Sequence, residues 1–597
     1  MVAILGISAF YHDSAAALLI DGQIVAAAQE ERYTRIKHDP SYPEHAIREV
    51  LRIGGLSGSD ISEVIFYEKP FLKFERLLET YHAFAPKGFS SFGKALPVWI
   101  KDKLYTKSNL QKRLTTQGIN APLLFTEHHL SHAASAFYPS PFEDAAILTI
   151  DGVGEWATAT IAHGKEHTIT VLKELYFPHS IGLLYSAFTY YCGFKVNSGE
   201  YKLMGLAPYA SKQSPRVKHY VQLIKENIVD IRDDGSILLE MSFFDFATGL
   251  EMTCNKRWSQ LFGIPKRESE SEISQEYIDL SLAAQLITEE ILLRLATTAQ
   301  AMTCSPNLVM AGGVALNCVA NAKLKTSGLF KNIWIQPAAG DAGGAVGATL
   351  SAWYIYHQQT RNPLDNDSMS GAYLGTDFSN KEIANFIRKK GIDATYYPEE
   401  ELYAVIAGLL NEGHIIGLVR GSMEYGPRAL GNRSIIADPR NIEMQKKLNM
   451  EIKFRETFRP FAPAVLEEDA SEYFDMNFPS PYMLFTAQLS EKYKLPLPDG
   501  YEDLPYMDKL YTPRSRFQAI THVDFSARVQ TVSTKTNPQF HALITAFKSL
   551  TGCCMVVNTS FNVRGEPIVC TPDDAYNCFL NTGMDCLVLE NYIIRKL

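Results

Sequence analysis

A pattern of three strands that occurs twice constrains the fold of this chain more than any other feature. The first copy comprises residues 3–8, 14–20 and 23–29, and the second comprises residues 145–150, 157–162 and 167–172. Asp21-Gly22 and His163-Gly164 are typical of the tight turn that joins a second strand to a third. Each copy also places polar residues directly after its first strand, where they can contact a ligand. The repeat indicates a duplicated domain with a ligand between its halves, and chance similarity of two hairpins is the alternative.

A histidine pair lies just before the second copy. Residues 127–137 are rich in Ala, Leu and His and contain neither Gly nor Pro, which favours a helix. His128 and His132 then lie on one face of that helix, because they are four residues apart. Asp151 follows the first strand of the second copy, and Asp341 lies in the glycine-rich sequence AAGDAGG. Imidazole and carboxylate ligands together suit Fe(II), Zn or Mn, so these residues predict a metal site, with a purely structural histidine pair as the alternative.

The composition of the chain limits its domain number and its partners. A length of 597 residues predicts at least two domains, and a net charge of −9 without a basic run argues against nucleic acid. Nine cysteines without a C-x-x-C pair favour a reducing compartment. The N-terminus has no signal-peptide pattern, and no apolar run is long enough to span a membrane. We therefore expect a cytoplasmic protein that binds small anionic molecules, with neither nucleic acid nor a membrane as partner.

Apolar periodicity is lost at residues 358–380, which are rich in Asn, Asp and Ser. We place the domain boundary there, which gives an N-terminal domain of residues 1–365 and a C-terminal domain of residues 366–597. Shortly before the boundary, the sequence NLVMAGGVALN joins an apolar strand to a glycine pair and a helix. Such a turn lets the main chain approach adenine or ribose closely, so Gly313 and Asn317 are candidate nucleotide contacts.

Cations and polar side chains cluster beside glycine-rich turns of the C-terminal domain. The set comprises Arg428 and Arg433 in MEYGPRALGNRS, Lys453, Arg455 and Arg459 in IKFRETFRPFAP, Arg528 in SARVQ, and Asn558, Ser560 and Asn562 in VVNTSFNV. The guanidinium fork matches phosphate oxygens, so this density of cations predicts an anion site. A solvated, charged surface is the alternative.

Motifs along the chain carry a family resemblance. They are GISAFYHDSAAAL, EERYTRIKHD, EHHLSHAASAFYPS, IDGVGEW, GEYKLMGLAPY, AGGVALN, GDAGGA, GPRALGNRS, IKFRETFRPFAP, THVDFSARVQTV and NTSFNVRGEPIV. Through them the chain resembles the O-carbamoyltransferases of the NodU/CmcH family. The resemblance implies an α/β protein with a duplicated actin-like (ASKHA) N-terminal domain, similar to the tRNA threonylcarbamoyl transferase, and an α+β YrdC-like C-terminal domain.

The resemblance also implies a reaction in two steps. Carbamoyl phosphate and ATP, with Mg²⁺, would form carbamoyl-adenylate and pyrophosphate in the C-terminal domain. The N-terminal domain would then transfer the carbamoyl group to a hydroxyl of a small acceptor and release AMP. The cofactors implied are Fe(II) or another divalent transition metal, and Mg²⁺ with ATP.

Residue roles follow from the resemblance. His128, His132, Asp151 and Asp341 would hold the metal; Lys37, Gly313 and Asn317 would bind carbamoyl-adenylate; Arg428, Lys453, Arg459, Arg528, Asn558 and Ser560 would bind ATP and carbamoyl phosphate. His12 would be the general base for the acceptor hydroxyl, with Asp13 beside it.

The acceptor is not identified by the sequence. Members of the family modify antibiotics, nodulation factors and toxins, and residues 60–118 and 211–272 are insertions where an acceptor pocket would be shaped. Residues 60–118 interleave aromatic and basic residues, which indicates the packed face of a helical layer rather than a nucleic-acid surface. A homodimer is compatible with the sequence. The alternative functions are a small-molecule kinase and an inactive ATP-binding regulator.

Overall fold

The computed structural model describes residues 1–100 and 104–596 and divides into two compact units. The first unit comprises residues 1–10, 15–27 and 50–368, and the second comprises residues 11–14, 28–49 and 369–597. A linear division near residue 366 therefore leaves out two short N-terminal segments that cluster with the second unit. Within that unit Arg35 donates to the carbonyl oxygens of Ile568 (2.6 Å) and Pro567 (2.9 Å), which ties the segment 28–49 to the C-terminal part of the chain.

The first unit contains a five-stranded mixed sheet in the order β3-β2-β1-β4-β5. Its strands are β1 (Ala3–Ser8), β2 (Ala15–Ile20), β3 (Gln23–Gln29), β4 (Glu63–Phe66) and β5 (Leu123–Phe125). β1 is antiparallel to β2 and parallel to β4, and β4 is parallel to β5. Every residue of β1 is buried, as expected for a central strand that is covered on both faces.

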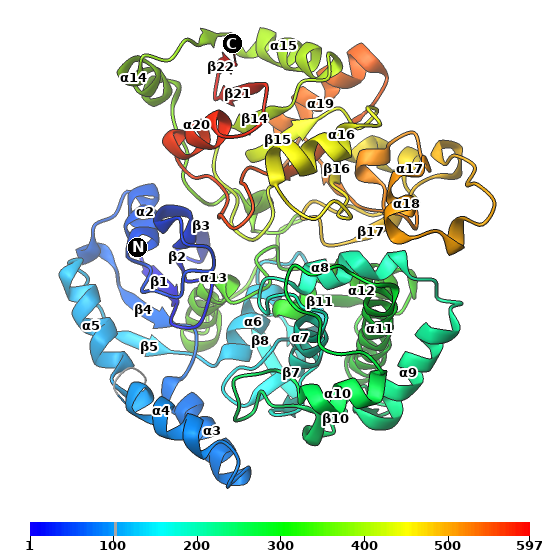
Figure 1. The fold of residues 1–597 in the computed structure, drawn as a ribbon. Helices are drawn as coiled ribbons and strands as arrows, with labels where there is room; N and C mark the ends of the chain where they lie inside the picture. Colours follow the sequence, from blue (N-terminus) through cyan, green and yellow to red (C-terminus); the bar gives the residue numbers. More distant parts are fainter. Residues whose placement is uncertain (101–103, 597) are drawn as a thin grey trace. The chain divides into compact units, whose positions relative to one another are not determined.

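A second sheet of the first unit has the order β12-β11-β6-β7-β8. Its strands are β6 (Asp144–Ile150), β7 (Ala157–Lys165), β8 (Thr168–Tyr176), β11 (Asn307–Ala311) and β12 (Asn332–Ile335). β6 is antiparallel to β7 and parallel to β11, and β11 is parallel to β12. The strand order and directions thus repeat those of the first sheet, which confirms the predicted duplication and the actin-like α/β plan. Figure 1 labels β1, β2 and β4 of the first sheet and β7, β8 and β11 of the second.

The turn predicted at His163-Gly164 is wrong. β7 continues through both residues, and the chain reverses at Glu166, which has a φ of 54°. Gly164 is required for another reason: a Cβ there would lie 2.5 Å from the ring of Phe137. A glycine that accommodates a packed aromatic ring resembles a turn glycine when only the sequence is read.

Helices α6 (His128–Phe137) and α13 (Ala342–Ser351) pack against each other, and α13 also covers β1 and β2. The approach is close, since a Cβ on Gly347 would lie 1.8 Å from the Ser131 carbonyl oxygen. The other elements of this unit are α3 (Pro70–Ala83), α4 (Phe89–Trp99), α5 (Thr106–Thr116), α7 (Ile181–Tyr191), α8 (Glu200–Leu206), α9 (Pro215–Asn227), α10 (Asn255–Phe262), α11 (Gln275–Thr303), α12 (Cys318–Thr326), and a hairpin of β9 (Val229–Ile231) and β10 (Ile237–Leu239). The long helix α11 contacts α7, α8, α9 and α12.

The second unit is built on an eight-stranded mixed sheet in the order β13-β22-β21-β14-β15-β20-β16-β19. These strands are β13 (Thr395–Tyr396), β14 (Ile416–Val419), β15 (Arg433–Ala437), β16 (Ala462–Leu466), β19 (Gln530–Val532), β20 (Met555–Ser560), β21 (Cys586–Leu589) and β22 (Tyr592–Arg595), and β17 (Thr486–Gln488) pairs with β18 (Ser526–Arg528). Its helices are α1 (Glu31–Thr34), α14 (Asn380–Lys390), α15 (Glu399–Asn411), α16 (Met444–Lys447), α17 (Ala470–Tyr473), α18 (Tyr506–Tyr511), α19 (Pro538–Thr551) and α20 (Pro572–Leu580), while α2 (Glu44–Gly54) spans the two units. The YrdC-like identity of this unit stays a prediction.

Candidate functional site

Four predicted metal ligands meet at the carboxyl edge of the second sheet. α6 presents His128 and His132 one helical turn apart, Asp151 follows β6, and Asp341 immediately precedes α13. One ligand atom from each of the four lies within 4.8 Å of every other. His128 Nε2 is 3.0 Å and His132 Nε2 is 3.2 Å from Asp151 Oδ2. Asp341 Oδ1 is 3.9 Å and 3.8 Å from the same two nitrogen atoms.

These distances fit the ligand set of one divalent ion. Two atoms that are each about 2.1 Å from an ion, at tetrahedral or octahedral angles, are about 3.0–3.4 Å apart. The two Nε2 atoms, 3.2 Å apart, and Asp151 Oδ2 satisfy that condition. Asp341 would move by less than about 1 Å to join them. The mixed nitrogen and oxygen donors suit Fe(II), Zn or Mn.

The charges of the cluster are strongly coupled because its side chains are buried. Burial by itself lowers the pKa of His128, but the hydrogen bond with Asp151 and the charges of Asp341, Asp151 and Glu155 raise that pKa to about 9. Burial opposes ionisation of Asp151, yet hydrogen bonds from both histidines hold its pKa well below the usual range. The neighbouring His129 has a lowered pKa, from burial and the charges of His128 and His132, and bonds to Thr149 instead (2.6 Å). An anionic carboxylate thus faces the two imidazoles, as a cation site requires.

Main-chain hydrogen bonds hold the ligands in place. Asp151 Oδ1 accepts from the backbone N–H groups of Gly152 (2.8 Å) and Gly313 (3.3 Å), so the predicted nucleotide contact Gly313 lies directly beside the metal cluster. The carboxylate of Glu155 accepts from the N–H groups of His128 (3.0 Å) and Lys69 (2.7 Å). Glu155 is absent from the predicted site set, although its place in IDGVGEW, shortly after Asp151, is a usable signal.

Asn317, also predicted to contact the nucleotide, is engaged within the protein. Its Oδ1 accepts from the N–H of Ala320 (3.1 Å) and so caps α12. Its Nδ2 donates to Gln285 Oε1 (3.1 Å), and Gln285 Nε2 donates back to Asn317 Oδ1 (3.2 Å). The side chain therefore has a structural role in this conformation, and its predicted ligand contact stays a prediction.

Lys453 is the centre of a second cluster, in the second unit. It is 2% exposed, and its Nζ donates to the Ser560 carbonyl oxygen and to Asn562 O (2.9 Å) and Oδ1 (3.0 Å). Ser560 Oγ also donates to Asn562 Oδ1 (2.8 Å). The predicted pair Lys453 and Ser560 is thus brought together by the loop that follows β20. Asn562 belongs to the polar set that the sequence indicates after this strand, and the structure places it in the loop just beyond β20.

Other predicted cations act electrostatically on Lys453. Burial, together with the charges of Arg455, Arg459 and Lys37, holds the pKa of Lys453 well below its usual range. Lys37 therefore lies in the electrostatic neighbourhood of Lys453, within the second unit, whereas the resemblance had grouped it with Gly313. Mutual repulsion between these cations would be relieved by a bound polyanion, so the cluster is suited to binding one.

Asn558 bonds to residues that lie near two further predicted cations in the sequence. Its Nδ2 donates to Gln530 Oε1 (2.7 Å) and to the carbonyl oxygen of Ala429 (3.3 Å). Arg428 directly precedes Ala429, and Arg528 lies two residues before Gln530. The Asn558 Oδ1 atom is buried and has no hydrogen-bond partner in the described part of the chain. A buried acceptor without a partner is compatible with a ligand site.

Arg433 is another of the cations predicted beside glycine-rich turns, but its side chain is not available to an anion. It is fully buried in β15, and its guanidinium donates to the carbonyl oxygens of Gly421 (2.9 Å) and Thr376 (2.8 Å). Its role is structural, because a cation enclosed by main-chain carbonyl groups has no room for a phosphate.

The predicted base His12 belongs to a third group, within the second unit. Asp13 bridges two imidazoles: its Oδ2 is 3.1 Å from His12 Nδ1, and its Oδ1 is 2.7 Å from His38 Nδ1. Burial raises the pKa of Asp13, but the two histidines outweigh it and hold the pKa well below the usual range. With Nδ1 donating to Asp13, the basic lone pair of His12 is on Nε2. His38 was not predicted, although it directly follows Lys37 in the motif.

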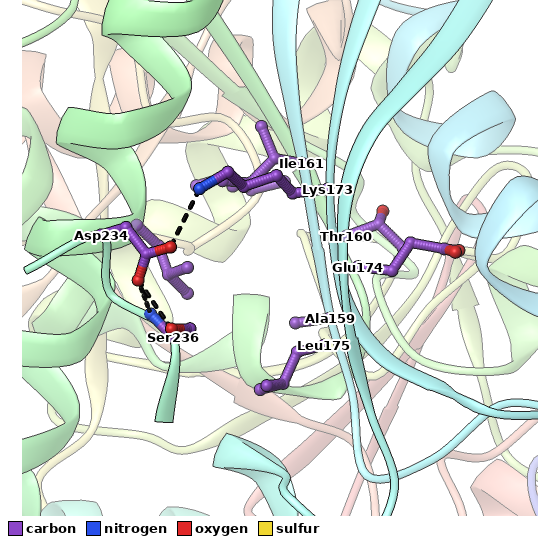
Figure 2. Close-up of a pocket in the computed structure, with 10 residues that line it drawn as sticks. Ala159, Thr160, Ile161, Lys173, Glu174, Leu175, Asp234 and Ser236 are labelled. Atoms are coloured by element: carbon purple, nitrogen blue, oxygen red, sulfur yellow. Dashed lines mark hydrogen bonds and ion pairs between the residues drawn. The ribbon is translucent and has the colours of Figure 1, made fainter. Parts of the chain in front are cut away.

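A cavity of about 250 Å³ in the first unit, shown in Figure 2, is lined by none of the predicted site residues. Lys173 Nζ donates to Asp234 Oδ2 (2.9 Å), and Ser236 Oγ donates to Asp234 Oδ1 (2.6 Å). The remaining lining includes Leu175 and Leu295. Because the polar groups already pair with one another, the cavity offers no reactive side chain.

The sequence matches two family signatures and several curated proteins. Residues 3–350 match the family described as carbamoyltransferase N-terminus, and residues 407–596 match carbamoyltransferase C-terminus. An uncharacterized protein of Synechocystis sp. is 54% identical over 100% of this chain and 97% of its own length. Nodulation protein NolNO of Sinorhizobium fredii is 34% identical over 98% of this chain and 79% of its own length. Nodulation protein NolO of Bradyrhizobium diazoefficiens is 35% identical over 79% of this chain and 78% of its own length.

Within the described residues, no helix has both the length and the apolar character needed to cross a membrane.

The two family signatures cover most of both units, and relatives above 30% identity match nearly the whole chain. The chain belongs to the carbamoyltransferase family.

Proposed function

We propose that this protein transfers a carbamoyl group from carbamoyl phosphate, through carbamoyl-adenylate made with ATP and Mg²⁺, to a hydroxyl of a small-molecule acceptor. The carrying observation is that two chemically different clusters occur in one chain of this family. One is a buried histidine and aspartate cluster in the first unit, and the other is a lysine and arginine cluster in the second.

The second unit would form the adenylate. Carbamoyl phosphate would be hydrolysed to carbamate and inorganic phosphate, and the carbamate would attack the α-phosphate of ATP and displace pyrophosphate. ATP and carbamoyl phosphate bring several negative charges together, and Lys453, with Arg459 and Lys37 nearby, would offset their repulsion. The low pKa of Lys453 in the absence of ligand would rise when a polyanion binds beside it, since an opposite charge favours the ammonium form. Arg428 and Arg528 would add bidentate contacts to phosphate oxygens.

The first unit would carry out the transfer. His128, His132, Asp151 and Asp341 would hold a divalent transition metal, of which Fe(II) is one candidate, and the bound ion would supply Lewis acidity toward the adenylate. The N–H of Gly313, already directed at Asp151, keeps the glycine-rich backbone next to that position. Burial of the cluster would exclude water, which would otherwise hydrolyse the mixed anhydride.

His12 would accept the proton of the acceptor hydroxyl. Asp13 fixes the imidazole through Nδ1, so proton transfer would take place at Nε2. The developing imidazolium would be stabilised by the Asp13 carboxylate, which stays ionised because its pKa is low. The acceptor would be a hydroxylated natural product or sugar, as in secondary-metabolite biosynthesis.

The products of ATP turnover test this proposal. Purified protein is incubated with ATP, Mg²⁺ and carbamoyl phosphate, with and without a panel of hydroxylated acceptors. A carbamoyltransferase of this type releases AMP and pyrophosphate only when carbamoyl phosphate is present, and it carbamoylates an acceptor. A kinase instead releases ADP, and an inactive regulator releases neither, so either result would contradict the proposal.

A further inference from the structure

Helix α3 is inverted relative to an ordinary surface helix. It buries the charged side chains Lys73 (7% exposed) and Arg76 (6%) but exposes Phe71 (62%) and Leu78 (37%). Surface helices normally bury an apolar stripe and expose charged residues, because that arrangement removes the most apolar area from water. An apolar face turned outward indicates that something apolar covers it.

The inward charges are firmly held, so the orientation of α3 is set by specific partners. Lys73 Nζ donates to Glu68 (2.7 Å), and Arg76 Nη1 donates to the carbonyl oxygen of Gly154 (2.8 Å). The guanidinium of Arg76 also lies 5.2 Å from the ring centroid of Phe177. A rotation of α3 that buried Phe71 would break the hydrogen bonds of Lys73 and Arg76 and leave their partners without a cation. These bonds therefore stabilise the observed orientation of the helix.

The following helix, α4, continues the apolar surface. Its Phe92 and Trp99 lie against Tyr81 of α3, with ring centroids 5.1 Å and 5.7 Å from the Tyr81 ring, and Figure 1 shows the two helices at the outer edge of the first unit. Phe89 is 82% exposed. Among residues 81–100 whose side chains the structure describes, none is buried. Residues 60–118 were predicted to be the packed face of a helical layer. α5 confirms this in part, because it buries Leu110 and Leu114, but residues 81–100 do not follow the prediction.

A loop of the same unit adds one more apolar residue. Ser91 Oγ donates to the carbonyl oxygen of Thr248, which fixes the start of α4 to this loop. Leu250, two residues further on, is 95% exposed. We call Phe71, Leu78, Phe89 and Leu250, with the lysines of the next paragraph, the aromatic–basic surface.

The charge of this region is opposite to that of the chain. Residues 71–126 contain nine Lys and Arg residues and three acidic residues, of which Glu75 and Glu79 are exposed on α3, whereas the whole chain has a net charge of −9. Lys87, Lys94, Lys107 and Lys112 are exposed. Exposed Phe and Leu side chains among lysines are the composition of helices that lie in the interface of an anionic bilayer.

We propose that the aromatic–basic surface docks this protein on an anionic lipid membrane. Phe89 and Leu250 would enter the boundary between headgroups and acyl chains, and the lysines would contact lipid phosphates. This revises our expectation that the protein has no membrane partner, which rested on the lack of a spanning segment. Docking at a surface needs no spanning helix.

Other partners fit the surface less well. A twofold dimer formed through it would place the same patch on both subunits, so lysines would face lysines. Single-stranded nucleic acid would stack on aromatic rings, but Leu78 and Leu250 offer no ring. Apolar side chains and an excess of exposed lysines over acidic residues together match a membrane interface.

The surface is connected to the metal cluster. α3 begins directly after Lys69, whose backbone N–H donates to the Glu155 carboxylate that also holds the His128 main chain. Docking would therefore bring the metal cluster within one helix length of the lipid, about 20 Å. The inference does not depend on the proposed transferase chemistry.

Sedimentation with vesicles tests the proposal on the full-length protein. Vesicles of phosphatidylcholine mixed with phosphatidylglycerol are compared with vesicles of phosphatidylcholine alone. The wild-type protein is expected to bind the mixed vesicles, to bind phosphatidylcholine alone weakly, and to lose binding as salt is raised. The double variant Lys87→Gln/Lys94→Gln should weaken binding about tenfold or more. Phe89→Ser/Leu250→Ser should also weaken binding about tenfold or more, at each salt concentration at which the wild-type protein binds the mixed vesicles.

Matched controls carry the same changes on the second unit. Lys381→Gln/Lys389→Gln alters two exposed lysines of α14, and Leu550→Ser/Leu580→Ser alters two exposed leucines (55% and 51%). Both should bind vesicles like the wild type. Equal loss in the controls, or no vesicle binding by the wild type, would overturn the proposal. So would self-association that Phe89→Ser/Leu250→Ser abolishes, or tighter binding to single-stranded nucleic acid than to vesicles.

Tryptophan fluorescence gives an independent readout of the contact. The chain has five tryptophans, and Trp99 is the one on α4. Mixed vesicles should shift the wild-type emission to shorter wavelength, and Trp99→Phe should abolish that shift while it preserves sedimentation. A shift that persists in Trp99→Phe would show that a different face meets the lipid.

Discussion

The Nε2 atoms of His128 and His132 lie 3.2 Å apart, and both are directed at one carboxylate oxygen of Asp151. The Nδ1 atoms of both rings are buried and accept or donate no hydrogen bond within the described residues. Two imidazoles that converge through the same ring position leave room for a single proton between them, or for a single ion. This relationship underlies the first prediction.

Purified protein should contain about one transition-metal ion per chain, and His132→Ala should lose it while it remains folded. Metal analysis and circular dichroism measure the two effects. His163→Ala is the control, because His163 pairs with Asp144 (3.1 Å) outside the cluster and should keep the metal. A wild-type protein that is metal-free and fully active in the presence of a chelator would contradict the metal assignment.

His12→Asn should leave adenylate formation intact and lower carbamoyl transfer by roughly a hundredfold or more, since general base catalysis typically contributes that much. Pyrophosphate release and acceptor carbamoylation are measured in parallel. His45→Asn changes another histidine that bonds to a carboxylate, Glu30 (2.6 Å), and should affect neither step. Unchanged transfer in His12→Asn would remove His12 from the mechanism.

Lys453→Ala should abolish pyrophosphate release, because the variant lacks the lysine that would offset the repulsion between the negative charges of ATP and carbamoyl phosphate. Carbamoyl-adenylate supplied by a separate enzyme should restore acceptor carbamoylation in this variant. His128→Ala should show the opposite behaviour and make the adenylate without using it. Lys446→Ala, at an exposed lysine of α16, should behave like the wild type. If preformed adenylate fails to rescue Lys453→Ala, or if His128→Ala stops pyrophosphate release, the two chemistries share one site.

The pH dependence of stability should reveal the buried Lys453. Its pKa is below the value of 10.5 usual for lysine, so between the folded pKa and pH 10.5 the unfolded chain binds more protons at this side chain. Its contribution to the free energy of unfolding therefore rises with pH across that window, by at most about 1.4 kcal/mol per pH unit. Lys453→Met should lack this slope, so its stability advantage over the wild type should shrink as pH rises. Urea denaturation at several pH values measures the difference, and parallel curves for the two proteins would contradict a lowered pKa.

Contiguous residues determined the local structure. The repeated strands, the helix that carries the histidine pair, and the positions of Asp151 and Asp341 at element ends were predictable, because periodicity and glycine placement are encoded within short stretches. The convergence of those four side chains also followed, since parallel strands place their carboxyl ends at one edge.

Only the tertiary structure decided which partner each side chain meets. The sequence predicts a turn at Gly164, but the ring of Phe137 packs against that glycine, and the hydrogen bond of Asn317 with Gln285 has no signal in the sequence. Lys37 acts electrostatically on Lys453, and α3 turns Lys73 and Arg76 inward because Glu68 and Gly154 accept their hydrogen bonds. Such partners can be far away along the chain, so the local sequence does not predict them. The role of each side chain then depends on its burial and its contacts as well as on its residue type.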